Sequence, residues 1–145
     1  RRSSDLGEAS RRFSEETENR LVVALSDADL DLEATSTARS RLNLANVLDT
    51  ASQRNIPVLV VGPTPTLDEQ RNARLAELNA AYLDVADRRN HVYVDTFTPL
   101  VGHEQWRADL ASGQGRPGQA GHGLIAWLVL HRGWYQWLGL PEPTA

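Results

Sequence analysis

The ten residues PVLVVGPTPT, Pro57 to Thr66, decide the fold of this 145-residue chain. Pro57 to Val61 is a continuous apolar run with three valines, which is typical of a strand buried on both faces of a parallel sheet. The prolines after Gly62 end the strand, because proline cannot donate to a strand ladder. From about Asp68 to Arg89 the periodicity is helical, with one apolar stripe of Leu75, Leu78, Tyr82 and Val85. These residues predict one strand–turn–helix unit of an α/β fold.

The same alternation continues on both sides of this unit. LVVAL (Leu21 to Leu25) and HVYVD (His91 to Asp95) are two further short apolar runs. Helical patterns begin at about Thr37, near His103 and near Gly118, and the last one runs to about His131. The aromatic segment Trp134 to Leu138 is expected to extend that helix or pack beside it. The expected core and helix-packing aromatic residues of this region are Trp127, Trp134, Tyr135 and Trp137. The fold class is therefore α/β, a doubly wound parallel sheet of three strands with helices on both faces.

Composition indicates one globular domain over residues 1–145 and excludes several functions. The hydrophobic share is 41%, the charged share 23% and the net charge −4, so no nucleic acid partner is expected. No apolar run has the length of a membrane span. All 15 basic residues are arginine and cysteine is absent, which excludes Schiff-base lysines, thiol nucleophiles and thiolate metal sites. With no methionine, the chain is expected to be amino-terminally incomplete, and its compartment, cytoplasmic or secreted, stays undetermined.

Active sites of parallel sheets lie where strands end at their carboxyl edge. Three predicted segments meet that condition: Ser26 to Asp31, Gly62 to Thr66 and Asp95 to Thr98. The loop Ala111 to Pro117 joins them because it opens the last helix. A site is expected to draw on these four segments.

The stretch GQGRPGQAGHGLIAW, Gly113 to Trp127, resembles the last conserved block of the SGNH (GDSL-type) ester hydrolases. In that family an Asp-x-x-His-Pro loop supplies two members of a Ser-His-Asp triad, and a helix follows. Here Pro117 and the helix are in place, but Gly113 stands at the Asp position and Arg116 at the His position. The PVLVVGPTPT unit and the Trp106 to Leu110 segment are also similar to the family.

The resemblance implies a serine ester hydrolase that acts on acyl or acetyl esters, without a cofactor or metal. Its Gly-Asp-Ser block is missing from these residues. Where the family has Gly-x-Asn-Asp, the chain reads Ser26-Asp27-Ala28-Asp29, so Asp29 matches but Ala28 cannot donate an oxyanion hydrogen bond. We therefore expect no ester hydrolysis from this chain.

Two other functions stay open. A non-catalytic binding module is one, with Arg116 recognising a small anionic ligand, or with a protein partner. A rebuilt triad is the other, with Ser26 as nucleophile, His103 as base and Asp95 orienting it. His122 is a weaker replacement base, since it lies inside the last helix.

An acidic series and an apolar strand edge bear on metal binding and on self-association. Asp27, Asp29 and Asp31 imitate the start of a calcium loop, but Leu32 and Ala38 stand where that loop needs Gly and Glu, so no metal is expected. If strands are missing beside Leu21 to Leu25, that apolar edge predicts self-association.

Overall fold

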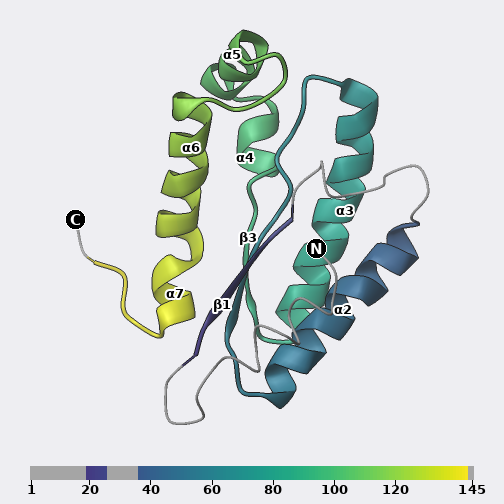
Figure 1. Ribbon diagram of the computed structural model, residues 1–145, viewed down its shortest axis with the longest axis vertical. Coiled ribbons are helices and arrows are strands. Elements are labelled where there is room, and N and C mark those ends of the chain that lie inside the picture. The colour runs from purple at the N-terminus through teal and green to yellow at the C-terminus, as the bar shows by residue number, and fades with distance from the viewer. Residues whose placement is uncertain (1–18, 26–35, 144–145) are drawn as a thin grey trace.

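Three parallel strands form the centre of the computed structural model, which describes residues 19–25 and 36–143 (Figure 1). Strand β1 (Leu21–Ala24) pairs with β2 (Val58–Val61), and β2 pairs with β3 (Val92–Val94), so the order is β1-β2-β3. Leu21 lies opposite Val58, and Leu59 lies opposite Val92. The predicted α/β class and parallel three-stranded sheet are therefore confirmed.

Helices α2 (Thr37–Gln53) and α3 (Glu69–Arg88) cover one face of the sheet (Figure 1). Each begins at a side-chain cap, because Ser36 accepts the Arg39 N–H and Asp68 accepts the N–H groups of Gln70 and Arg71. The core between helices and sheet contains Leu44, Leu48, Val58, Val60, Leu78, Tyr82 and Val85. The apolar stripe predicted on α3 is buried along its whole length.

The other face carries the remaining helices. These are α4 (Thr98–Val101), α5 (Glu104–Ser112) and α6 (Gln119–Val129), which continues through a π-helical turn, η2 (Leu130–Trp134), into α7 (Tyr135–Leu138). A Cβ on Gly133 would lie only 2.6 Å from Cγ2 of Val94, so the π-turn backbone rests directly on the sheet. The core on this face of the sheet contains Leu59, Val61, Val94, Leu100, Trp106, Leu110, Leu128 and Trp137. The aromatic segment thus extends the last helix.

The prediction that the carboxyl-terminal aromatic residues are core is correct only in part. Trp137 is buried, but Trp127 is 52% exposed and Trp134 is 36% exposed. These two side chains are seven residues apart on a continuous helix, so they share its outward side. Helical spacing identified the stripe but not the side of the helix that faces the sheet.

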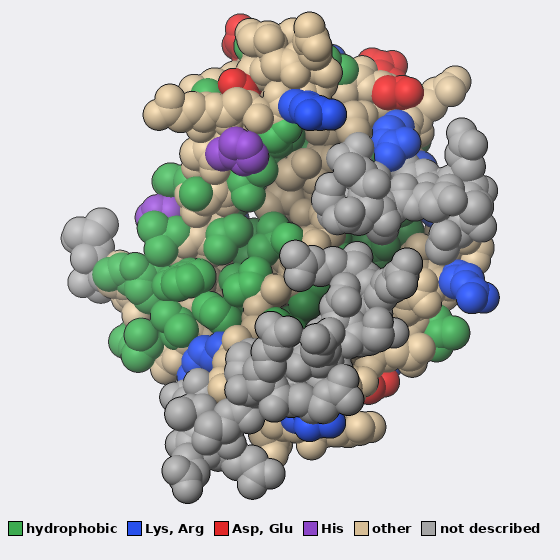
Figure 2. Space-filling model, in the orientation of Figure 1, with side chains coloured by type: hydrophobic (Ala, Val, Ile, Leu, Met, Phe, Trp, Pro, Cys, Tyr) green, Lys and Arg blue, Asp and Glu red, His purple; other side chains and the backbone are tan. Residues whose placement is uncertain are grey.

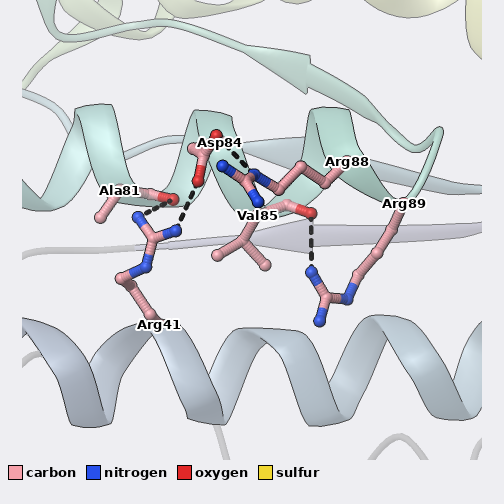
Figure 3. Close-up of polar contacts among 6 residues, drawn as sticks. All are labelled: Arg41, Ala81, Asp84, Val85, Arg88 and Arg89. Carbon is pink, nitrogen blue, oxygen red and sulfur yellow. Dashed lines mark hydrogen bonds and ion pairs between the residues drawn. The ribbon is translucent and has the colours of Figure 1, made fainter.

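Polar contacts fasten α2 to α3 on the surface (Figure 3). The Arg41 guanidinium donates to Asp84 and to the Ala81 carbonyl, and Arg88 Nε contacts the second Asp84 oxygen at 3.0 Å. Arg89 donates to the Val85 carbonyl. The hydrogen bonds from Arg41 and then Arg88 hold the pKa of the Asp84 carboxyl below its ordinary value. Because all these groups meet solvent, they orient the helices more than they stabilise them.

Candidate functional site

The loops at the carboxyl edge of the sheet are tied to one another by buried hydrogen bonds. The Thr96 hydroxyl donates to the carbonyls of Gly62 (2.8 Å) and Pro63 (3.1 Å), which joins the end of β3 to the end of β2. The indole N–H of Trp106 donates to the Pro65 carbonyl at 3.1 Å, which adds α5 to the same layer. The loops after β2 and β3 therefore meet at one edge, as predicted, in a fixed arrangement.

Asp95, the proposed orienting acid, is engaged in this layer through one of its carboxyl oxygens. Its Oδ1 accepts the backbone N–H groups of Phe97 and Thr98, each at 2.9 Å, and the amide of Asn79 at 3.1 Å. Asn79 in turn accepts the Tyr93 hydroxyl at 2.6 Å. Burial, and then the Asp95 charge, raise the pKa of Tyr93 far above its ordinary value, so this hydroxyl stays protonated as a donor. The network holds the start of α4 through Oδ1 of Asp95.

His103, the proposed base, is the N-cap of α5. Its Nδ1 accepts the backbone N–H of Trp106 at 3.3 Å, so a neutral ring carries its proton on Nε2. A triad histidine needs the opposite tautomer, with Nδ1–H donating to the acid and Nε2 free to accept. Between the described side chains of His103 and Asp95 no hydrogen bond forms. Ser26, Ala28 and Asp29 lie outside the described residues, as does the acidic Asp27 to Asp31 series, so the rebuilt triad stays a prediction.

A histidine–serine pair that the sequence analysis did not identify occurs at the opposite, amino edge of the sheet. Ser52 Oγ lies 2.9 Å from Nε2 of His91, and Nδ1 of His91 accepts the Val58 N–H at 3.2 Å. That acceptor role again places the ring proton on Nε2, so His91 donates to the serine and cannot take its proton. Burial lowers the pKa of His91 below its ordinary value, which keeps the ring neutral. The pair is structural.

The loop before α6 is a tight turn. Gln114 and Gly115 have φ values of +57° and +90°, and the Gly115 N–H donates to the Leu110 carbonyl at 2.8 Å. A Cβ on Gly113 would lie 2.2 Å from the Arg116 carbonyl oxygen, so this backbone leaves no room for a side chain at position 113. Arg116 is exposed, and its guanidinium contacts no acid among the described residues. His122 is likewise exposed, in the first turn of α6.

Asp109 organises this loop, although sequence reasoning assigned it no role. Its Oδ2 accepts the backbone N–H groups of Gly118 (2.6 Å) and Gly121 (3.0 Å) at the start of α6. Gly118 is the N-cap and has no side chain, so the capping group comes from α5 instead. A glycine at a helix N-cap is the signal that could have prompted a search for a distant carboxylate. This negative group already neutralises the helix end that an anion would use.

An open depression of about 340 Å³ lies beside these loops, between α3 and the α4–α5 segment. Phe97, Val101 and two alanines of α3 form its apolar walls, and Glu69 and Arg107 supply charge. Asn72 also lines it, but its amide is occupied by three hydrogen bonds with Thr66. Neither Gly113 nor Arg116 lines the depression.

Searches of the described residues found neither a metal site nor a membrane helix. No three His, Asp or Glu side chains among these residues converge as ligands. In the same part of the chain, every helix is too short or too polar to cross a bilayer.

Comparison with known proteins agrees with the architecture. The profile of the GDSL-like Lipase/Acylhydrolase family matches residues 5–124. The crystal structure of the lipase/acylhydrolase from Enterococcus faecalis superposes with a TM-score of 0.66 at 19% sequence identity, covering 100% of this chain and 75% of that one. At this identity the superposition establishes the fold alone. A search of curated proteins found no match. Because the profile spans most of the sequence, the chain belongs to the GDSL-like lipase/acylhydrolase family.

Proposed function

We propose that this chain is a non-catalytic member of its family, and that the scaffold serves as a protein-binding module. Membership implies an ester as the substrate class of an active relative. The proposal concerns the 145 residues as they stand, in which the loop before α6 carries Gly113 and Arg116 in place of the acid and base.

The observation that carries this proposal is that two histidines accept backbone N–H groups through Nδ1. His91 and His103 are the described histidines whose ring nitrogens accept a backbone N–H, and both accept through Nδ1. A base that must remove a serine proton through Nε2 would first have to lose that hydrogen bond and move its own proton. His122 is exposed on α6, and His131 stacks on Trp127 with ring centroids 4.4 Å apart. These contacts support the proposal that the described histidines do not act as the base of a triad.

The α6 terminus favours a protein partner over an anionic ligand. Anions bind helix N-termini through free N–H groups, but here Asp109 accepts those of Gly118 and Gly121. Arg116 alone would hold the anion, with a carboxylate nearby opposing it. The exposed apolar side chains of α6 and η2 supply a surface of the chemistry that protein partners use.

Ester turnover and active-serine labelling test the proposal. Purified chain is incubated with p-nitrophenyl acetate and p-nitrophenyl butyrate, and separately with a fluorophosphonate probe followed by peptide mass analysis. We expect hydrolysis equal to buffer and no labelled serine. Hydrolysis proportional to protein, abolished by Ser26→Ala and by His103→Ala, would instead establish the rebuilt triad. Ser52→Ala is the matched control, since that serine also has a histidine neighbour.

A titration with inorganic phosphate separates the two binding hypotheses. Backbone amide shifts that saturate in the chain and vanish in Arg116→Gln would support the anion module and contradict the protein-binding proposal. Arg107→Gln, which removes the arginine of the open depression, controls for general loss of positive charge.

A further inference from the structure

We infer that the open depression between α3 and the α4–α5 segment is a binding site for a free amino acid with a large apolar side chain, such as leucine. In this arrangement the ligand carboxylate contacts Arg107, the ligand ammonium group contacts Glu69, and the apolar side chain lies along the walls of the depression. The inference does not rest on the proposed function.

The depression lies beyond the carboxyl end of β3, between helices that pack on opposite faces of the sheet. Its lining residues all lie between positions 69 and 107, in a part of the chain that the structure describes throughout. Hydrophobic side chains also gather over α6 and η2 (Figure 2), but none of Trp127, Leu130 and Trp134 lines the depression. It is therefore distinct from the surface proposed for a protein partner.

One wall of the depression is a face of α3. Glu69 belongs to the first turn of this helix, and Ala73 and Ala76 follow it at helical spacing on the same side. With a rise of about 1.5 Å per residue, Ala76 lies about 10 Å beyond Glu69 along the helix axis. Phe97 and Val101, at the two ends of α4, provide the apolar contact from the other wall. The depression is thus charged at the start of α3 and apolar farther along it.

Arg107 belongs to the charged end as well. Its neighbour Trp106 donates to the Pro65 carbonyl at 3.1 Å, which holds the first turn of α5 beside the loop that leads into α3. Among the described residues, neither the Arg107 guanidinium nor the Glu69 carboxylate has an ion-pair or side-chain hydrogen-bond partner. Both residues are exposed, so a ligand can reach both charges.

The other polar side chains beside the depression are already used. The Asp68 carboxylate caps the start of α3, and the Asn72 amide is hydrogen-bonded to Thr66. Among the side chains that line the depression, Glu69 and Arg107 therefore remain to bind the polar part of a ligand.

These two opposite charges select a zwitterion. A ligand with a carboxylate alone is attracted by Arg107 but repelled by Glu69, and a ligand with an ammonium group alone meets the reverse. A free amino acid carries both groups on one carbon, so it neutralises both side chains while its own side chain covers the apolar walls.

The size of the depression fits one amino acid. Its volume of about 340 Å³ lies near the lower end of the range of about 300–1,000 Å³ that is typical of small-molecule sites. Because the depression is open and the ligand has few atoms, we expect a dissociation constant of about 1 mM.

An NMR titration of the unmodified chain at low salt, with matched ligands, tests the ligand class. Free leucine is expected to produce saturable backbone amide shifts at Ala73, Ala76, Val101 and Arg107. Three analogues each remove one feature: 4-methylpentanoate lacks the ammonium group, 3-methylbutylamine lacks the carboxylate, and glycine lacks the apolar side chain. Each analogue is expected to bind at least about fivefold more weakly than leucine. Equal binding of 4-methylpentanoate would establish a simple anion site and contradict the inference.

Substitutions within and beside the depression test its location. Arg107→Gln and Glu69→Gln are each expected to weaken leucine binding by about threefold to fivefold. Ala76→Trp fills the space along α3 and is expected to abolish the saturable shifts. Ala80→Trp is the matched control, because Ala80 is exposed one turn further along α3 and does not line the depression, so leucine binding should be unchanged. Circular dichroism confirms that each variant is folded.

Two results would overturn the inference. One is an absence of saturable shifts with leucine in the unmodified chain. The other is leucine binding that persists in Ala76→Trp, or that neither Arg107→Gln nor Glu69→Gln weakens.

Discussion

Two glycines of α6 provide a matched pair in which the same substitution should have opposite effects. A Cβ on Gly121 would lie 2.6 Å from Oδ2 of Asp109, 2.8 Å from Cβ of Pro117 and 3.1 Å from Cζ3 of Trp106. A Cβ on Gly123, two residues later in the same helix, would meet nothing within 4 Å. Alanine at either position removes the flexibility of a helical glycine, so the packing alone distinguishes them.

The magnitudes can be worked from these contacts. Replacing glycine by alanine inside a helix stabilises by about 1 kcal/mol, and at Gly123 nothing opposes that gain. At Gly121 the gain is opposed by overpacking, typically about 1–3 kcal/mol. Displacement of the Asp109 carboxylate also weakens a charged hydrogen bond, a further loss of about 1.5–3 kcal/mol. With the helical gain set against both losses, Gly121→Ala should therefore lower the free energy of unfolding by about 1.5–5 kcal/mol.

Urea unfolding followed by tryptophan fluorescence measures both variants, since Trp106 is fully buried beside Gly121. The expected order of midpoints is Gly123→Ala, then the unmodified chain, then Gly121→Ala, with similar slopes. If Gly121→Ala were as stable as Gly123→Ala, the close contact of α5 with the start of α6 would not exist as described.

Three further predictions concern the polar groups. Asp109→Ala removes the only side-chain cap described for α6 and should lower the free energy of unfolding, measured in urea, by about 1–3 kcal/mol. Asp109→Asn should recover part of this loss. An unchanged free energy of unfolding in Asp109→Ala would refute the capping role. Because the folded-state pKa of His91 is depressed, its contribution to stability is complete above the ordinary histidine pKa and is lost as the pH falls below it. Thermal melts from neutral to mildly acidic pH should show a steeper decline for the unmodified chain than for His91→Gln, and parallel declines would contradict this. Gly113→Asp combined with Arg116→His should show no p-nitrophenyl ester turnover, because the Gly-Asp-Ser block is missing from these residues. The melting temperature of this variant should also be lower, because the Asp side chain collides with a backbone carbonyl. Ester turnover by this variant would show that a nucleophile is present and would contradict that expectation.

The sequence predicted those elements whose signals are local. Apolar runs with valine located all three strands, and the caps Ser36 and Asp68 stand where α2 and α3 begin. The α4 helix went unpredicted because four residues show no periodicity, and its start depends on Asp95 accepting two N–H groups. The exposure of Trp127 also escaped prediction, since the covering of a helix depends on the extent of the sheet beneath it.

The candidate site was less predictable because its hydrogen bonds join residues distant in sequence. Asp109 and Gly118 lie on either side of the loop between α5 and α6, and β2 and α3 separate Ser52 from His91. Spacing could suggest which residues reach the carboxyl edge, but not which partner each would find there. The tautomer of a histidine, on which a catalytic role depends, is set by such a partner.

The polar groups of the carboxyl edge explain how this scaffold tolerates Gly113 and Arg116. Asp95 starts α4, His103 starts α5 and Asp109 starts α6, so each of these helices obtains its capping group from a side chain outside the Gly113–Arg116 turn. The turn itself is held by backbone hydrogen bonds to Leu110 and Asp109, which any sequence with small residues could make. No described helix takes its capping group from the side chains at positions 113 and 116, although the backbone at Gly113 leaves no room for a Cβ. The start of each of these helices is therefore independent of the groups that ester chemistry would need in this turn, and membership of the family does not by itself establish activity.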